Sequence, residues 1–231
     1  MGSKYIFVEA AVESLAAALA AAEGGAHRIE LCTNLARGGT TPAVELLGEC
    51  RARLSIPVFV LVRPRPGDFV YTAAEHQVTL EQIRSAKAAG AQGIVTGELT
   101  ASHEIAVDRT AELIAAARPL PVTFHRAFDE CSELTVALET LIQLGVERVL
   151  TSGGAPTARD GAEQLRRLVE QSQERIGILA GGGVAASNVA RLVQVAGVRE
   201  IHFSVNDAEK VHRIIRALKG ELPPLPNRGR Q

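Results

Sequence analysis

The sequence has no tryptophan, and aromatic side chains make up only 3% of its 231 residues. It also has no excess of positive charge, because 25 Lys and Arg residues are set against 26 Asp and Glu residues, which gives a net charge of -1 at pH 7. Surfaces that bind nucleic acid combine basic stretches with aromatic rings that stack on the bases, and anionic membranes attract basic segments. We therefore expect neither a nucleic-acid partner nor a membrane partner.

Long apolar runs are missing as well. The longest are far shorter than the roughly 20 residues that cross a bilayer. The residues 1–4 lead directly into a strand-like run, without the basic and apolar regions of a secretory signal. The three cysteines, Cys32, Cys50 and Cys131, are widely spaced and form no CxxC pair. An odd number of separated cysteines is typical of reduced thiols, so we expect a cytoplasmic protein.

A turn of small residues around a glycine, followed by a short apolar run, occurs four times. The four runs are Arg28–Leu31, Ile94–Thr96, Val149–Thr151 and Ile201–Phe203. Glycine is favoured where a helix ends in a left-handed conformation. An apolar run rich in β-branched residues is typical of a buried parallel strand. Each repeat therefore predicts the end of a helix and the strand that follows it.

Four more strand-like runs lie between these repeats, at residues 5–9, 57–63, 121–126 and 176–180. Amphipathic helical stretches separate all eight. An open doubly wound sheet also alternates strands and helices, but the fourfold repeat, the count of eight and the length favour a closed barrel. We predict an α/β fold, a single (β/α)8 TIM barrel with a parallel eight-stranded closed sheet and outer helices. Residues 1–222 form this domain, and residues 223–231 form a flexible Pro-rich tail.

Side chains alternate along a strand, so one parity faces the barrel interior. The polar residues identify that parity, and the ionisable ones are Glu9, Arg28, Glu30, Arg63, Glu98, His125 and His202. Tyr5, Cys32, Thr96, Val149, Thr151 and Ser204 share it. Buried charges are costly unless they are paired. They form either an ion network that closes the barrel or contacts with a ligand. Because barrel sites form at strand ends, the ligand interpretation is favoured for Glu30, Arg63 and His125, whereas both remain open for Glu9 and Arg28.

Glycine-rich loops follow two of the last strands. They contain Gly181, Gly182 and Gly183 after one strand, and Thr151, Ser152 and Gly153 after another, while Ser204 ends the eighth strand. Open backbone N–H groups at helix N-termini bind anions, and barrels commonly hold phosphate at this position. The alternative is that these glycines only permit tight turns. Both readings remain open.

Two absences limit the chemistry. The lysines are Lys4, Lys87, Lys210 and Lys219, and none ends a strand, so a Schiff-base aldolase is not expected. No segment carries histidines and carboxylates at metal-ligand spacing, so a zinc or magnesium site would need ligands from separate strands.

Five motifs occur in a characteristic order. They are Glu30–Cys32 with Gly38–Pro42, Arg63–Tyr71, Thr123–Asp129, Arg148–Gly153 and Ala180–Gly183. Together they resemble the CutC family, which is named for copper homeostasis. The resemblance implies a TIM barrel that forms a homodimer or higher homo-oligomer, with copper(I) bound by cysteines at the positions of Cys32 and Cys50. CutC-like chains usually carry a longer segment after the eighth strand, whereas here a helix is predicted at Ala208–Lys219.

The residues suggest two functions of different kinds. In the first, the protein binds copper(I), which prefers thiolates. Cys50 lies about 12 Å along the next helix, however, at 1.5 Å per residue, and the favoured interpretation is that it is a small buried residue. In the second, the chain is an enzyme for a small anionic metabolite, with His125 or Glu30 as acid or base and Arg63 gripping the anion. Further site candidates are Glu9, Asp129 and His202. A third option, a barrel scaffold within a complex, does not explain the charged interior.

Overall fold

The computed structural model describes residues 5–205 and 207–220, and the predicted barrel is confirmed. Eight strands pair in parallel in chain order, and β8 closes onto β1. They are β1 (Phe7–Val12), β2 (Arg28–Leu31), β3 (Val58–Leu61), β4 (Gly93–Thr96), β5 (Val122–Phe124), β6 (Arg148–Thr151), β7 (Gly177–Ala180) and β8 (Glu200–Ser204). The predicted tail, residues 223–231, lies outside the described residues.

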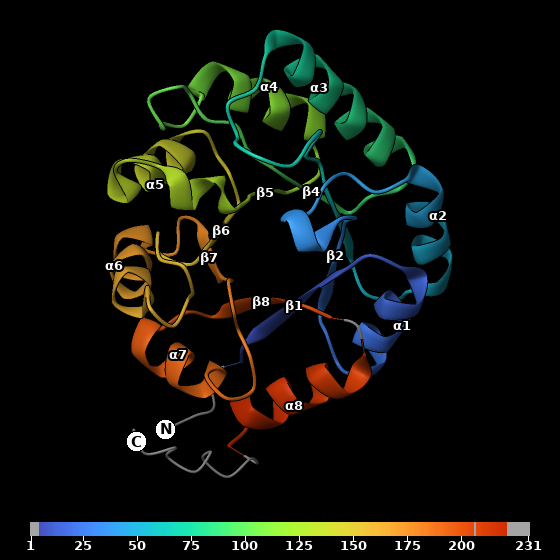
Figure 1. The fold of residues 1–231 in the computed structure, drawn as a ribbon, viewed down its shortest axis with the longest axis vertical. Helices are drawn as coiled ribbons and strands as arrows, with labels where there is room; N and C mark the ends of the chain where they lie inside the picture. The colour runs from blue at the N-terminus through green and yellow to red at the C-terminus, as the bar shows by residue number, and fades with distance from the viewer. Residues whose placement is uncertain (1–4, 206, 221–231) are drawn as a thin grey trace.

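The α-helices form a ring around the strands (Figure 1). They are α1 (Leu15–Glu23), α2 (Val44–Arg53), α3 (Ala73–Ala88), α4 (Val107–Ala117), α5 (Leu134–Gln143), α6 (Ala162–Ser172), α7 (Val189–Ala196) and α8 (Ala208–Leu218). Two short 3-10 helices, η1 (Leu35–Arg37) and η2 (Arg126–Glu130), follow β2 and β5. None of the helices in the described ranges is long and apolar enough to cross a membrane.

The four glycine turns hold the conformation that the repeats predicted. Gly25, Gly90, Gly145 and Gly197 have φ values of 93°, 91°, 74° and 70°. A residue with a Cβ atom is strained in this left-handed region. These glycines therefore let the chain leave α1, α3, α5 and α7 and turn directly into the next strand.

The sheet separates two apolar regions. The larger one packs between the outer face of the barrel and the helices, and it includes Ile29, Val60 and Ile201. The smaller one fills part of the interior with Cys32, Phe59, Leu61 and Val95. The rest of the interior is polar, because charged side chains occupy the inward positions of β1, β2, β6 and β8.

Three parity assignments were wrong. On β4, Val95 is in register with Leu61 of β3 and Thr123 of β5, so Thr96 and Glu98 face the helices. On β6, Arg148 is in register with Thr123, so Val149 and Thr151 face outward. Tyr5 precedes β1, and 69% of its surface is exposed.

Glycines explain the error on β4. The inward positions beside Val95 are Gly93 and Gly97, and a Cβ atom at Gly93 would lie 2.4 Å from the Phe59 ring. A large neighbour therefore fills the interior here. The outward Glu98 is fully buried and instead contacts His76 of α3 at 2.8 Å.

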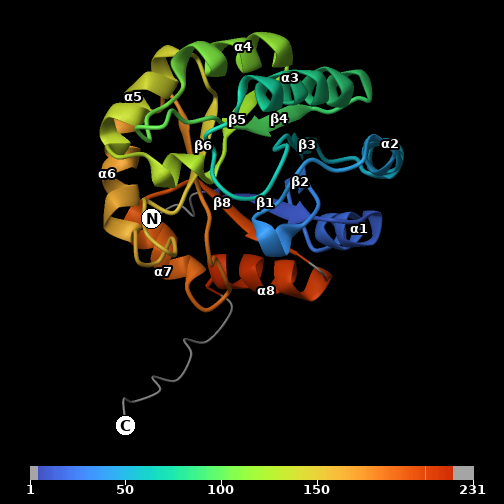
Figure 2. The same cartoon turned by 45° about the horizontal axis from the view of Figure 1, so that its top comes forward.

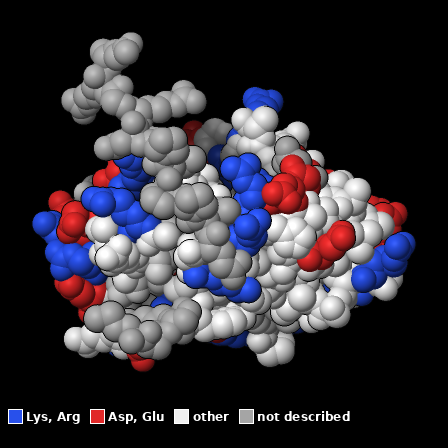
Figure 3. Space-filling view, turned by 90° about the horizontal axis from the view of Figure 1, so that it is seen from below, with Lys and Arg blue, Asp and Glu red and all other residues white. Residues whose placement is uncertain are grey.

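The carboxyl ends of the strands open into the mouth of the barrel. The loop after β2 carries η1 inside the ring of helices (Figures 1 and 2). On the side shown in Figure 3, Lys and Arg side chains lie interspersed with Asp and Glu.

Candidate functional site

A cavity of about 440 Å³ occupies the mouth of the barrel. Seven predicted site residues line it: Glu30, Arg63, His125, Gly182, Gly183, His202 and Ser204. They come from β2, β8 and the loops after β3, β5 and β7, so segments that are distant in sequence converge here. The other site candidates, Glu9, Asp129, Thr151, Ser152, Gly153, Gly181, Cys32 and Cys50, do not line it.

Glu30 is buried without a hydrogen-bond partner. Only 4% of its surface is exposed, and its Oε2 atom has no partner among the described residues. Burial disfavours the charged carboxylate, and the nearby Glu9 charge acts in the same direction. Together they raise the pKa of Glu30 to about 7, against the opposing charges of His202 and Arg28. A carboxyl group with such a pKa can both donate and accept a proton at neutral pH.

His125 has the opposite character. Burial and the neighbouring Arg63 charge lower the pKa of its imidazole to about 3, so the ring is neutral at pH 7. Its Nδ1 atom accepts a hydrogen bond from the Ala127 backbone N–H at 3.3 Å, which assigns the proton to Nε2. Nε2 is buried without a partner. His125 therefore offers a neutral N–H donor and is poorly suited to act as a base.

Glu9 and Arg28 belong to an ion network deeper in the barrel. Arg28 pairs with Glu9 and, at 3.1 Å, with Glu200, which also pairs with Arg148 at 2.7 Å. Burial alone would raise the pKa of Glu9, but the Arg28 charge and a hydrogen bond from His202 outweigh it and lower the pKa to about 2. The contacts of Glu9 and Arg28 are therefore those of an ion network within the barrel.

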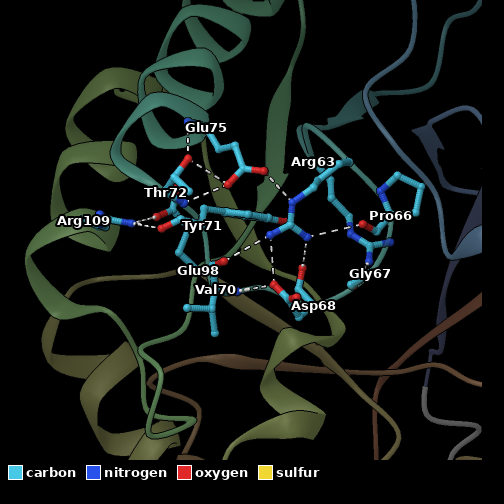
Figure 4. Close-up of polar contacts among 11 residues, drawn as sticks. Arg63, Pro66, Gly67, Asp68, Val70, Tyr71, Thr72, Glu75, Glu98 and Arg109 are labelled. Atoms are coloured by element: carbon cyan, nitrogen blue, oxygen red, sulfur yellow. Dashed lines mark hydrogen bonds and ion pairs between the residues drawn. The ribbon is translucent and has the colours of Figure 1, made fainter.

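Arg63 holds two loops together. Its Nη1 atom donates to the carbonyl oxygens of Gly38 and Gly39 at 3.1 and 3.0 Å. Its Nη2 atom donates to the Gly67 carbonyl oxygen at 2.6 Å (Figure 4). The guanidinium also lies 4.6 Å from the centre of the Phe69 ring. Because the Nη1 atom already donates to two carbonyl oxygens, a bidentate grip on a ligand through Nη1 and Nη2 together would break existing bonds. Nε is buried without a partner, and no described carboxylate pairs with Arg63.

The loop after β3, which contains Arg63, is held in place by further contacts. Arg65 donates to Glu75 at 2.5 Å and to Asp68 at 2.9 Å. Arg109 of α4 donates to the Tyr71 carbonyl oxygen at 2.6 Å and lies 3.5 Å from Glu98 (Figure 4). These contacts hold Phe69 against the His125 ring, with the ring centres 4.8 Å apart.

The donors after β6 are already occupied by a carboxylate of the chain. Asp129 accepts from the Thr151 hydroxyl at 2.5 Å and from the backbone N–H groups of Ser152 and Gly154 at 3.0 Å. Arg126 also donates to it at 2.8 Å. The Asp129 carboxylate therefore uses the hydrogen-bond donors that the sequence pattern predicted for an anionic ligand.

The loop after β7 leaves its donors open. Neither Gly182 nor Gly183 uses its backbone N–H in a hydrogen bond within the described residues. Lys210, in the first turn of α8, also lines the cavity and donates to the Ser204 carbonyl oxygen at 2.6 Å. Lys210 and Arg126 line the cavity as well, although neither was predicted from the sequence. Two positions could have indicated them: Lys210 lies in the first helical turn after β8, and Arg126 directly follows His125.

The cysteines are placed poorly for copper. Cys32 is fully buried in the inner cluster and donates to the Val12 carbonyl oxygen at 3.4 Å, whereas Cys50 belongs to the core outside the barrel. Burial, with the charges of Glu30 and Glu13, raises the pKa of Cys32 well above its ordinary value. Copper(I) needs thiolates that converge on one point. This arrangement does not provide them.

Among the residues that the structure describes, one group of side chains has metal-ligand spacing. Glu9, Glu30 and His202 each bring one ligand atom within 4.8 Å of the others. Two carboxylates and an imidazole suit a divalent cation better than copper(I). However, both Glu9 oxygens are occupied, one by Arg28 and one by His202. The Arg28 charge opposes a second cation at this place.

Comparison with known proteins gives consistent matches. The model of the CutC family matches residues 6–207. A human protein named copper homeostasis protein cutC homolog is 46% identical over 85% of this chain and 72% of its own length. A CutC family protein of Vibrio vulnificus is 47% identical over 85% of this chain and 80% of its own length. A CutC crystal structure from Streptococcus agalactiae has a TM-score of 0.82 and 33% identity, and the match covers 90% of this chain and 99% of that one.

Proposed function

This chain belongs to the CutC family, and from the chemistry of its barrel mouth we propose that it is an enzyme acting on a small anionic metabolite. The observation that carries the proposal is a pair of uncompensated charged groups in one cavity. Glu30 is a buried carboxyl without a partner, and Arg63 is a buried guanidinium without a carboxylate. Burying either charge without an opposite charge bonded to it is costly, so the loop contacts of Arg63 do not by themselves explain why both groups lie in this cavity.

Each group has a distinct part in this proposal. Glu30 exchanges a proton with the substrate, since its pKa of about 7 suits both directions of transfer. The neutral His125 donates through Nε2 to an oxygen that gains negative charge. The open backbone N–H groups of Gly182 and Gly183, together with Lys210, hold the anionic group of the substrate. Arg63 contributes charge and its free Nε, while its terminal nitrogens keep the two loops in place.

The first test is anion binding. Inorganic phosphate is titrated by calorimetry, and a library of anionic metabolites is screened by thermal shift. We expect Lys210→Ala to weaken phosphate binding about tenfold, the effect of one lost charge-assisted contact. The matched control is Lys87→Ala, since Lys87 is an exposed lysine that also donates to a backbone carbonyl, at the end of α3. The proposal is overturned if no anion binds, or if the two variants behave alike.

Copper homeostasis is the second candidate, and the names of the relatives favour it. In that function, copper(I) would be the cargo and Cys32 and Cys50 the ligands. The two thiols lie on opposite sides of the sheet, so binding copper between them needs a rearrangement of the barrel. A copper(I) titration separates the two candidates. The homo-oligomer and the cytoplasmic location stay predictions.

A further inference from the structure

We propose that His202 is a second acid–base residue of the mouth cavity, that Glu9 positions it, and that it shares one proton with Glu30. This inference rests on the proposed enzymatic function and deepens it. His202 lies on β8 and lines the cavity, and its side chain is 12% exposed. Nothing in the acid–base assignment of Glu30 and His125 uses this histidine.

The orientation of His202 is fixed from behind. Its Nδ1 atom lies 2.7 Å from Oε1 of Glu9, which is fully buried. The other Glu9 oxygen accepts from Arg28, and Arg28 is also held by Glu200. Glu9 therefore cannot turn away, and it assigns a proton to Nδ1. This arrangement leaves Nε2 as the nitrogen that can exchange a proton.

The charges around His202 call for one mobile proton. The groups that face it are Glu9 from β1, Glu30 and Arg28 from β2, and Gly181, without a side chain, from β7. Arg28 is shared with Glu200, and Arg148 also pairs with Glu200. Three carboxylates thus stand against two guanidinium groups, and one proton on either Glu30 or His202 balances them.

Both groups have a raised pKa. Burial of the imidazole alone would lower the pKa of His202, but the charge of Glu30 and the hydrogen bond and charge of Glu9 raise it above the ordinary 6.5. The pKa of Glu30 is also raised, to about 7. Because the atoms of the group lie within 4.8 Å, each proton position depends on the other.

Such a pair suits an anionic substrate in which a carbon that bears a hydrogen and a hydroxyl group lies beside a carbonyl group. Glu30 takes the proton from carbon, the C–H electron pair forms a C=C bond, and the carbonyl electron pair moves to oxygen. Protonated His202 gives its proton to that oxygen while His125 donates a hydrogen bond. Glu30 then returns its proton to the former carbonyl carbon, and His202 takes a proton from the neighbouring hydroxyl group. The result is an isomerised hydroxycarbonyl compound, with no oxidant, no reductant and both residues in their starting states.

The test is the pH titration of the histidine ring signals by NMR in the whole protein, with the His202 signal assigned from His202→Gln. We expect His202 to titrate above the ordinary 6.5 in the natural sequence and to fall towards it or below it in Glu30→Gln. Glu9→Gln should lower it as well. Glu147→Gln is the matched control, since it removes a carboxylate that pairs with Arg118 outside this network, and it should leave the signal nearly unchanged.

Two results overturn the proposal. One is a His202 titration whose pKa is the same in Glu30→Gln as in the natural sequence. Because Glu30 makes no hydrogen bond, this variant should fold, and it keeps the test valid if Glu9→Gln does not. The other is stoichiometric Zn²⁺ binding that suppresses the titration and is lost in Glu30→Gln, because the three residues would then be metal ligands. Phosphate is added in a separate arm. Ring signals that do not respond to it count against the proposed function and leave the shared proton intact.

Discussion

At the scale of single residues, Glu30 has a large effect because it is buried and no hydrogen bond stabilises its charge. Its neighbour Glu9 has two cationic partners and a pKa of about 2, whereas Glu30 has no hydrogen bond and a pKa of about 7. Two carboxylates in one barrel are thus driven in opposite directions. Such separation is typical of sites in which one group stays charged and the other transfers protons.

The raised pKa predicts that Glu30 destabilises the folded protein at neutral and higher pH. The unfolded carboxyl ionises near its ordinary 4.5, so above that pH folding must retain a proton or bury a charge. The cost grows as pH rises from 4.5 to about 7 and is then constant. At about 1.4 kcal/mol for each pH unit it reaches up to about 3 kcal/mol. We expect Glu30→Gln to stabilise the protein by up to this amount at pH 8 and by almost nothing at pH 4.5, measured by urea unfolding.

Glu9 has the opposite effect on the free energy of unfolding at neutral pH, so it serves as the control. Its lowered pKa stabilises the fold above pH 4.5 and is lost as pH falls towards 2. Glu9→Gln should therefore destabilise at pH 8. A Glu30→Gln variant that is less stable than the natural sequence at pH 8 would contradict the assignment of Glu30 as an unpaired group.

The sequence identified the polar residues of the mouth, but not what each one contacts. Glu30, Arg63, His125 and His202 could be predicted because a polar side chain at the end of an apolar strand is unusual. The bonds of Arg63 to the Gly38, Gly39 and Gly67 carbonyls could not, because they depend on how two separate loops pass over the barrel.

At the scale of the elements, the strand order and the repeats were predictable, and the facing of individual strands was not. Polar residues gave the correct parity on β1, β2 and β8. On β4 the rule failed, since Gly93 and Gly97 occupy the inward positions and the outward Glu98 finds a partner on α3. The pattern of one strand does not show how large the side chains on the next strand are. Here the size of Phe59 decides that the neighbouring inward position must be a glycine.

The loop between β6 and α6 yields a prediction of its own. Asp129 gathers hydrogen bonds from Thr151, Ser152, Gly154 and Arg126, and it is nearly buried. Asp129→Asn replaces a charged acceptor with a neutral amide that must face several donors. We expect a loss of about 2–4 kcal/mol in the free energy of unfolding, measured with urea.

Asp160→Asn is the matched control for this loop. Asp160 accepts from the Thr157 hydroxyl at 2.7 Å, but it is exposed, so its replacement should cost about 0.5 kcal/mol or less. Equal effects of the two substitutions would show that the contacts of Asp129 contribute no more than an ordinary surface bond.

At the scale of the whole molecule, the closed sheet divides the chain into an inside and an outside, and this division decides the copper question. Cys32 lies inside with Phe59, Leu61 and Val95, and Cys50 lies outside among the side chains between the sheet and the helices. A metal ion could contact both thiols only if the sheet between them opened. Opening it means breaking hydrogen bonds between paired strands, and in a closed barrel this disturbs the whole sheet.

We therefore expect no stoichiometric copper(I) site that depends on both cysteines. The measurement is a titration under reducing conditions with a chromophoric copper(I) chelator as competitor, on the natural sequence, on Cys32→Ser and on Cys32→Ser with Cys50→Ser. Cys131→Ser is the matched control, since Cys131 is a buried thiol on another loop. Any weak binding should be the same in all four proteins. One equivalent of copper(I) that is held against the chelator and lost with Cys32 would contradict this expectation. If Cys50→Ser alone also loses this copper(I), both thiols are ligands and the barrel must open in solution, which circular dichroism of the copper-loaded protein would detect as a loss of strand signal.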